Sequence, residues 1–331
     1  MNGTAPLAIG DPIPDIRLAN QAGDAVSFQH QSVAGSPAIL FLCPSRIEND
    51  IARSPAAPLA AAAEDFAAFS TRIFAVSPSG LESHRLLARQ LPPNMQLLSD
   101  PVRKLLDAFG KLTAQRLIVL RPNMRVAAVL DGEDAIADAL AICGTFVSAD
   151  SPVVAHQAPV LIVDHIFTPA FCASLIGLWN RSEKSGNRLA GNDDARIEVA
   201  ITDNLVNRDI QNYFAGRLLP ELAKAFRFQV TGFERNRVIS YSAKRNEQFR
   251  RHRDGGPAQS RQRAFVLTLN LNDDYDGGES LFPEYGHGRY RPSLGAGLVF
   301  SSALLHQAAP VVKNQKFSLV TFFSGRALDM S

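Results

Sequence analysis

Three side chains in the second half of the chain have the types and the spacing of a metal-binding triad. His252 and Asp254 are two residues apart, and His306 follows on a later predicted strand. Residues two apart on a β-strand point to the same side, so one strand end can supply two ligands. Two histidines and one carboxylate on one face of an ion leave its other positions open, which is typical of non-haem Fe(II) sites. The pattern therefore predicts a catalytic Fe(II) site at His252, Asp254 and His306.

A buried charge is expected close to this triad. Lys316 begins an apolar segment with the composition of a final strand, and Ser318 lies two residues later on the same face. A buried ammonium needs an anion, because an isolated charge is costly to remove from water. A lysine with a neighbouring hydroxyl can bind the distal carboxylate of a dicarboxylate. Lys316 and Ser318 therefore predict a dicarboxylate cosubstrate beside the metal.

The surrounding segments have the composition of short strands separated by turns. Residues 264–271 are rich in β-forming side chains, residues 272–278 form a turn cluster, and residues 317–323 are apolar again. Because His306 lies beyond several glycines, the sheet has to curl to bring it back to His252. A closed double-sheet roll of the cupin type does this. The fold class expected for this half is therefore α+β on a double-stranded β-helix (jelly-roll) core.

Together these features resemble the catalytic core of the Fe(II)/2-oxoglutarate dioxygenases, in particular the prolyl 4-hydroxylase-like branch. The resemblance spans roughly residues 159–326 and includes an opening helix near 166–172. The other matching positions are Tyr241, Phe249, the Asp276-Gly277-Gly278-Glu279 turn and Gly295. The resemblance implies a hydroxylase that uses Fe(II), 2-oxoglutarate and O2. In that reaction 2-oxoglutarate is decarboxylated to succinate and CO2 while an unactivated C–H bond of the substrate is oxidised.

The resemblance also bears on individual residues. It implies that the triad holds the iron and that Lys316 with Ser318 binds 2-oxoglutarate. Tyr241 is either a further cosubstrate contact or a core aromatic with a bonded hydroxyl. Halogenating relatives replace the carboxylate with Gly or Ala, so the presence of Asp254 favours hydroxylation or a related oxidation. The chain departs from many relatives near Thr268, where a tyrosine often contacts the cosubstrate.

A glycine-rich, polar loop at residues 255–263 follows the predicted carboxylate ligand. Its position beside the iron makes it a candidate lid. Arg261 and Arg263 are candidates for recognising an anionic substrate in bidentate fashion, and the alternative is a solvated basic rim. The substrate remains open between a residue in a protein, a free amino acid and another small molecule, because fold does not determine function.

The first half of the chain has a different pattern. From Gly10 to about Gly144, predicted strands alternate with helices, which indicates an α/β sheet with helices on both faces. A helix is expected over residues 56–69, between buried strands at 37–42 and 72–76. The segments 10–15, 40–44, 76–77 and 98–101 resemble the peroxiredoxin branch of the thioredoxin fold, over roughly residues 7–143.

The nucleophile of that family has no counterpart here. The peroxidatic cysteine of peroxiredoxins follows the position of Pro44 on the first turn of a helix, where the helix dipole lowers the pKa of the thiol. Residues 45–51 contain neither Cys nor Thr, although Arg116 resembles the activating arginine. Cys43 is expected to be a small core residue at the end of a strand. We therefore expect a non-catalytic domain that mediates docking or self-association. For the chain as a whole, the alternatives to an oxygenase are a thiol peroxidase that uses Cys43 and a non-catalytic binding module in which neither half is active.

Length and composition limit the remaining possibilities. A chain of 331 residues fits two domains, and we expect a thioredoxin-fold domain at 1–146, a linker at 147–158 and an oxygenase domain at 159–331. The net charge of +2 is too small to indicate a nucleic-acid partner. No apolar stretch is long enough to span a membrane, and no secretory signal is evident. Three cysteines without disulfide or metal spacing fit a reducing compartment, so the expected location is cytoplasmic.

Overall fold

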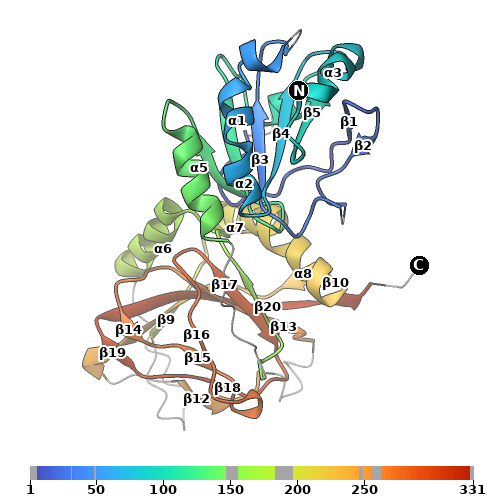
Figure 1. Cartoon of the computed structure of the whole chain (residues 1–331). Helices are drawn as coiled ribbons and strands as arrows, with labels where there is room; N and C mark the ends of the chain where they lie inside the picture. The colour runs from blue at the N-terminus through green and yellow to red at the C-terminus, as the bar shows by residue number, and fades with distance from the viewer. Residues whose placement is uncertain are drawn as a thin grey trace. The chain divides into compact units, whose positions relative to one another are not determined.

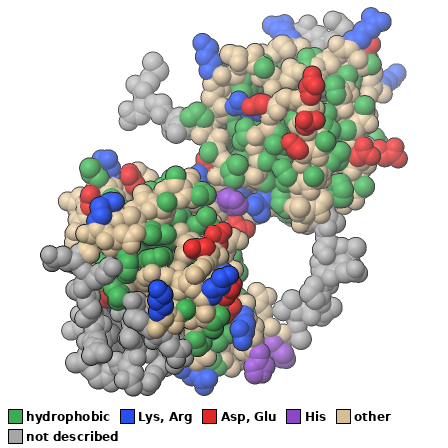
Figure 2. Space-filling model, turned by 90° about the vertical axis from the view of Figure 1, so that its left-hand side faces the viewer, with side chains coloured by type: hydrophobic (Ala, Val, Ile, Leu, Met, Phe, Trp, Pro, Cys, Tyr) green, Lys and Arg blue, Asp and Glu red, His purple; other side chains and the backbone are tan. Residues whose placement is uncertain are grey.

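The computed structural model describes residues 6–30, 32–47, 50–146, 156–182, 197–245, 249–254 and 262–328. The chain divides into two compact units, Met1–Pro152 and Val153–Ser331 (Figure 1). Most of the predicted linker, residues 147–155, lies outside the described residues, so the predicted domain boundaries stay predictions. On the face shown in Figure 2, basic and acidic side chains are interspersed with apolar ones on each unit, as the small net charge of +2 suggests.

The first unit is built on a seven-stranded sheet in the order β2-β1-β5-β4-β3-β6-β7. The strands are β1 (Leu18–Asn20), β2 (Ala25–Val26), β3 (Ala38–Leu42), β4 (Arg72–Ser77), β5 (Met95–Ser99), β6 (Arg116–Leu120) and β7 (Val126–Leu130). The three central strands β3, β4 and β5 are parallel, whereas β6 and β7 form an antiparallel hairpin. Parallel strands have to be buried on both faces, which explains the continuous apolar run of β3.

Helices cover both faces of this sheet. They are η1 (Ile51–Arg53), α1 (Ala57–Ala61), α2 (Ala63–Ala67), α3 (Leu81–Leu87), η2 (Ala88–Gln90), α4 (Lys104–Ala108) and α5 (Ala135–Gly144). From β3, Ile39 and Phe41 join one buried cluster with α1, α2 and α5, and Leu40 and Leu42 join another with α4. The predicted α/β thioredoxin-like fold is thereby confirmed. The single helix expected over residues 56–69 is instead two short helices, because Ala62 has a ψ of 5° between them.

The second unit contains two main sheets. The larger one has the order β8-β17-β13-β20-β11-β9 with β10 also on β20, the smaller one has the order β12-β18-β15-β16, and β14 pairs with β19. The strands are β8 (Val160–Val163), β9 (Ile197–Ala200), β10 (Phe228–Phe233), β11 (Arg237–Ser242), β12 (Phe249–His252), β13 (Phe265–Asn270), β14 (Asp276–Gly277), β15 (Ser280–Leu281), β16 (Arg289–Tyr290), β17 (Gly297–Ser301), β18 (His306–Ala308), β19 (Val311–Lys313) and β20 (Gln315–Ala327).

Helices cover the outer face of the larger sheet (Figure 1). They are α6 (Pro169–Arg181), α7 (Asn204–Tyr213), the π-helix η3 (Phe214–Leu218) and α8 (Leu219–Phe226), and short 3-10 turns lie at η4 (Ala243–Arg245) and η6 (Pro283–Tyr285). The predicted start of α6 is confirmed, because the Thr168 hydroxyl accepts from the Phe171 amide at 3.2 Å. The π-helix separates α7 from α8, and within it Arg217 donates to the His165 carbonyl at 3.0 Å.

Alternation along the strands of the larger sheet separates the helix-covered face from the inner face. Leu267, Leu269 and Leu319 pack in the cluster under the helices. Their neighbours Thr268 and Ser318 line a cavity between the two sheets. This arrangement confirms the predicted jelly-roll core. None of the described helices is long and apolar enough to cross a membrane.

Candidate active site

The pairing of β12 with β18 brings the two histidines of the triad together. His252 lies directly opposite His306 in the antiparallel register, and residues in such positions point to the same face. Their ring centroids are 4.3 Å apart. One ligand atom from each of His252, Asp254 and His306 lies within 4.8 Å of the others. Within the described ranges, no other cluster of three His, Cys, Asp or Glu side chains has this property.

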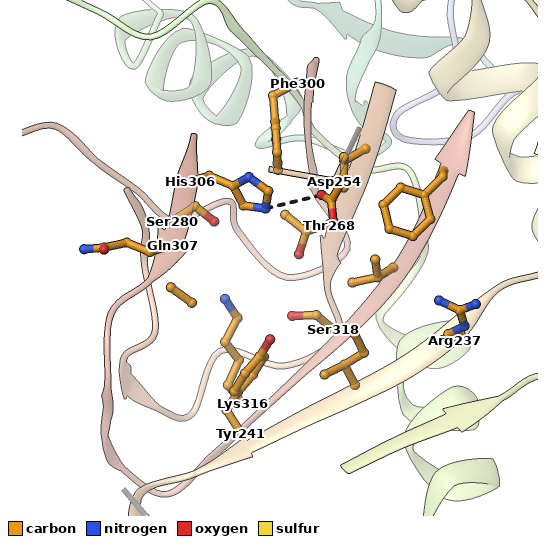
Figure 3. A pocket seen from close by; sticks show the side chains of 15 residues that line it. Arg237, Tyr241, Asp254, Thr268, Ser280, Phe300, His306, Gln307, Lys316 and Ser318 are labelled. Carbon is orange, nitrogen blue, oxygen red and sulfur yellow. Dashed lines mark ion pairs between the residues drawn. The ribbon is translucent and has the colours of Figure 1, made fainter. Parts of the chain in front are cut away.

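Asp254 lies between the two imidazoles, just beyond the end of β12. Its backbone amide donates to the Ser302 carbonyl at 3.0 Å, which holds the chain against the end of β17. One carboxylate oxygen lies 3.4 Å from Nε2 of His252. The other lies 3.4 Å from Nε2 of His306 (Figure 3). Burial raises the pKa of Asp254, but the hydrogen bond with His252 and the nearby charges of His306 and Arg263 outweigh burial and hold this pKa below its usual value.

The ring of His306 is oriented by the backbone. Its Nδ1 lies 3.1 Å from the Leu304 carbonyl, which can only accept, so this nitrogen donates and the lone pair of the neutral ring lies on Nε2, the nitrogen on the side of Asp254. The side chain is buried and packs edge-on against Phe300, with ring centroids 4.7 Å apart. Two imidazole nitrogens and one ionised carboxylate, fixed in this way, match the donor set of a facial Fe(II) site.

Lys316 is buried in β20, directly opposite Tyr241 of β11. Its ammonium donates to the Gly278 carbonyl at 2.6 Å. Burial lowers the pKa of Lys316 to about 8, although the carboxylate of Glu279 acts in the opposite direction. Gly278 has a φ of +68°, and a Cβ there would lie 3.0 Å from Cδ of Lys316. A glycine at this turn therefore leaves space for the lysine chain, as well as supplying an acceptor.

Ser318 contributes a hydroxyl to the same cavity. The side chain is 2% exposed, and its Oγ has no hydrogen-bond partner among the described residues. A buried hydroxyl without a partner loses free energy on leaving water, so such a group is suited to a ligand. The cavity has a volume of about 80 Å³ and is lined by Ser318, Lys316, Tyr241 and two members of the triad, Asp254 and His306 (Figure 3). The residues present therefore fit a dicarboxylate next to a metal.

Of the two predicted substrate arginines, the structure describes only Arg263. Arg261 and most of the predicted lid lie outside the described residues. Arg263 donates to both oxygens of Glu234, at 2.5 and 2.7 Å, and its guanidinium lies 3.8 Å from the ring centroid of Phe322. Arg253, which lies between the proposed ligands His252 and Asp254 in the sequence, pairs with Glu284 at 2.6 Å.

Several cavity residues were not predicted from the sequence. They are Arg237, Thr268, Ser280 and Gln307, all of which line the cavity (Figure 3). The signal for Arg237 was its spacing, since it lies four residues before Tyr241 and so points to the same face of β11. This spacing predicts a cavity residue only when it is known which face of β11 points into the cavity.

The first unit contains no comparable constellation among its described residues. Cys43 is 0% exposed, and its sulfur lies 3.3 Å from Oγ of Ser45. Arg116 makes a two-pronged ion pair with Asp131, at 3.0 and 3.1 Å. The side chain that resembles the activating arginine of peroxiredoxins thus already has a carboxylate partner.

Comparison with protein families identifies both units. Residues 9–138 match the AhpC/TSA family, and residues 237–324 match the 2OG-Fe(II) oxygenase superfamily. No curated protein matches the chain.

Solved structures resemble one unit or the other. The chain is 18% identical to the viral collagen prolyl hydroxylase of Paramecium Bursaria Chlorella virus-1, over 51% of this chain and 98% of that chain, with a TM-score of 0.40. A Pseudomonas putida prolyl-4-hydroxylase is 19% identical over 52% and 94%, with a TM-score of 0.42. Peroxidoxin BcpB from Mycobacterium tuberculosis is 23% identical over 43% and 99%, with a TM-score of 0.36. On the two family matches, the chain joins an AhpC/TSA-family domain to a 2OG-Fe(II) oxygenase domain and is a 2-oxoglutarate-dependent dioxygenase that uses Fe(II) and O2.

Proposed function

We propose that the second unit hydroxylates an unactivated C–H bond at an iron held by His252, Asp254 and His306. The observation that supports this most is the approach of three suitable donor atoms to within 4.8 Å at the wall of a cavity that also contains a buried lysine. When bound there, Fe(II) with 2-oxoglutarate and O2 supplies the oxidising power for a C–H bond, and succinate and CO2 are released.

Each ligand of the proposed triad has a definite task. Nε2 of His252 and Nε2 of His306 present lone pairs, and Asp254 adds a negative charge that offsets part of the charge of the cation. The Leu304 carbonyl keeps His306 in the tautomer that can bind metal. The hydrogen bond from the Asp254 amide to the Ser302 carbonyl fixes the backbone that carries the carboxylate.

Lys316, Ser318 and Tyr241 are proposed to bind 2-oxoglutarate. The ammonium of Lys316 would pair with the distal carboxylate, and Oγ of Ser318, which lacks a described partner, would donate to the same group. Tyr241 lies opposite Lys316 in the register and lines the cavity, so its ring would bound the carbon chain of the cosubstrate. These side chains orient the cosubstrate and exclude water from its far end.

The binding of 2-oxoglutarate is expected to weaken as the pH rises above about 8. Burial lowers the pKa of Lys316 to about 8, so the free protein loses this proton as the pH rises through that value. A bound carboxylate favours the protonated lysine, and binding above pH 8 therefore requires proton uptake. Above the pKa the dissociation constant should rise by about tenfold per pH unit. Titration calorimetry between pH 7 and pH 9.5 would measure this dependence.

The matched control is Lys316→Arg, because a guanidinium stays charged throughout this range. The variant should show a flatter pH dependence than the wild type, whatever its absolute affinity. Equal pH dependence in the two proteins would show that another group is responsible for the titration.

The first unit is proposed to serve docking or self-association in a cytoplasmic enzyme. Its proposed lack of peroxidase activity rests on residues 45–51, which contain no cysteine, and on the complete burial of Cys43. A fully buried thiol is not reached by peroxide. The pairing of Arg116 with Asp131 removes a further activating charge.

Peroxide should therefore not be consumed catalytically by the full chain in the presence of thiol reductants. Peroxide loss can be followed with wild type and with Cys43→Ser, and the two proteins should match a blank without protein. Rapid consumption that disappears in Cys43→Ser would replace this proposal with that of a thiol peroxidase.

A further inference from the structure

Arg237 brings a second positive charge into the cavity of the proposed iron site. Arg237, Ile239 and Tyr241 alternate along β11 and all three line this cavity. At the rise of a β-strand, the four residues from Tyr241 to Arg237 correspond to about 13 Å. Since Tyr241 lies opposite Lys316, the two cations enter from different ends, with Ser318 between them (Figure 3).

The guanidinium of Arg237 is not neutralised by the described part of the chain. No hydrogen bond or ion pair joins it to any residue in the described ranges. Both oxygens of Glu234, the nearest carboxylate in the sequence, are used by Arg263. Glu198, which faces Ile239 from the neighbouring strand, has an interaction of its own, and its buried Oε2 makes no hydrogen bond to Arg237 or to any other described residue. A half-buried cation without an anion is unfavourable, and this favours binding of one from solution.

The cosubstrate does not satisfy Arg237. In the proposed function one end of 2-oxoglutarate lies at the metal and its distal carboxylate at Lys316, so neither carboxylate remains for a second cation. The cavity walls on this side include the apolar side chains of Val266, Val320 and Phe322, together with the hydroxyl of Thr268, which lies opposite Val320. Such walls suit a hydrocarbon skeleton and strengthen the attraction between a guanidinium and an anion.

We propose that Arg237 binds the carboxylate of the substrate, and that the substrate is a small carboxylic acid with an apolar skeleton, such as a free amino acid with an apolar side chain. The inference rests on the proposed function of the same cavity. Arginine presents two parallel N–H donors to a carboxylate, which fixes the orientation of the bound acid as well as its position. A residue within a polypeptide has no α-carboxylate, so this chemistry favours a free acid over a site in a protein chain.

The test compares carboxylates with their amides in a complex that cannot turn over. The full chain is loaded with Zn(II), which has no redox chemistry, and saturated with 2-oxoglutarate. Isobutyrate, benzoate and L-leucine are then titrated by calorimetry beside isobutyramide, benzamide and L-leucinamide. At least one acid should bind the wild type ten times more tightly than its amide. Arg237→Gln should lose this preference while binding 2-oxoglutarate normally.

The control variant is Arg235→Gln, which removes an exposed arginine two residues upstream and should behave as wild type. The inference is overturned if no acid is preferred over its amide, or if Arg237→Gln keeps the wild-type preference. It is also overturned if Arg237→Gln no longer binds 2-oxoglutarate. That result would not contradict the proposed oxygenase function. Failure of the Zn(II)-loaded wild type to bind 2-oxoglutarate would overturn the proposed function and this inference with it.

Discussion

Replacing Asp254 with Ala is expected to abolish Fe(II)-dependent turnover while the fold is retained. Asp254 is the only one of the three proposed ligands that carries a negative charge, and its two oxygens lie 3.4 Å from Nε2 of each histidine. Without it, two imidazoles whose centroids are 4.3 Å apart remain beside a cation with no anionic ligand. Metal content after gel filtration should fall well below one ion per chain, and product formation should fall to background.

His252→Ala should have the same consequence, because it removes one of two neutral nitrogen ligands. The matched controls are His287→Ala, at an exposed histidine, and Asp276→Ala, at an exposed carboxylate paired with Lys313. Both controls should keep the metal and the activity, and thermal unfolding should confirm that all four proteins are folded. Full activity in Asp254→Ala would show that the iron lies elsewhere.

Lys316→Met is expected to raise the dissociation constant of 2-oxoglutarate by at least 100-fold while the metal still binds. Removing one partner of a buried charge pair costs roughly 3–5 kcal/mol, because the remaining carboxylate is left without compensation. Methionine fills much of the same volume, so packing against Tyr275 and Gly278 is largely kept. Titration of the metal-loaded protein with 2-oxoglutarate measures the effect directly.

Lys313→Met provides the comparison, since Lys313 lies three residues earlier and its side chain is 67% exposed. An exposed lysine contributes little to binding at a distance, so this variant should match the wild type. If Lys316→Met bound 2-oxoglutarate as the wild type does, the distal carboxylate would have to lie at another cation. Arg237 would then be the first alternative, because among the described residues it is the other positive side chain that lines the cavity.

Much of the fold of the second unit could be predicted from local sequence. Strand β13 (Phe265–Asn270) and the start of α6 at Pro169 lie where β-forming composition and a Thr-Pro pair predict them. The proximity of His252 and His306 was predicted from residue types alone, and the β12–β18 register now supplies its physical basis. The histidines were informative because histidine is an unusual residue type inside a sheet.

Other features depend on contacts that no local pattern contains. The ion pair of Arg263 with Glu234 joins residues 29 positions apart, so Arg263 resembled a free substrate contact in the sequence. Arg237 resembled an ordinary polar residue at a strand end until its register with Val320 fixed its face. Helix propensity does not predict the break at Ala62 either, because the alanines on both sides of it favour a continuous helix.

The amount of succinate formed per chain would show whether this chain converts 2-oxoglutarate at an iron bound by the triad. The measurement uses purified wild type with 2-oxoglutarate, Fe(II) and air, beside samples that lack Fe(II) or O2 and a sample of Asp254→Ala. Succinate and CO2 are expected in equal amounts, and only from the complete mixture. Equal succinate without Fe(II), or from Asp254→Ala, would show that the triad does not hold a catalytic iron. Absence of succinate from metal-loaded wild type, whatever small carboxylic acid or peptide is supplied, would show that the chain does not convert 2-oxoglutarate.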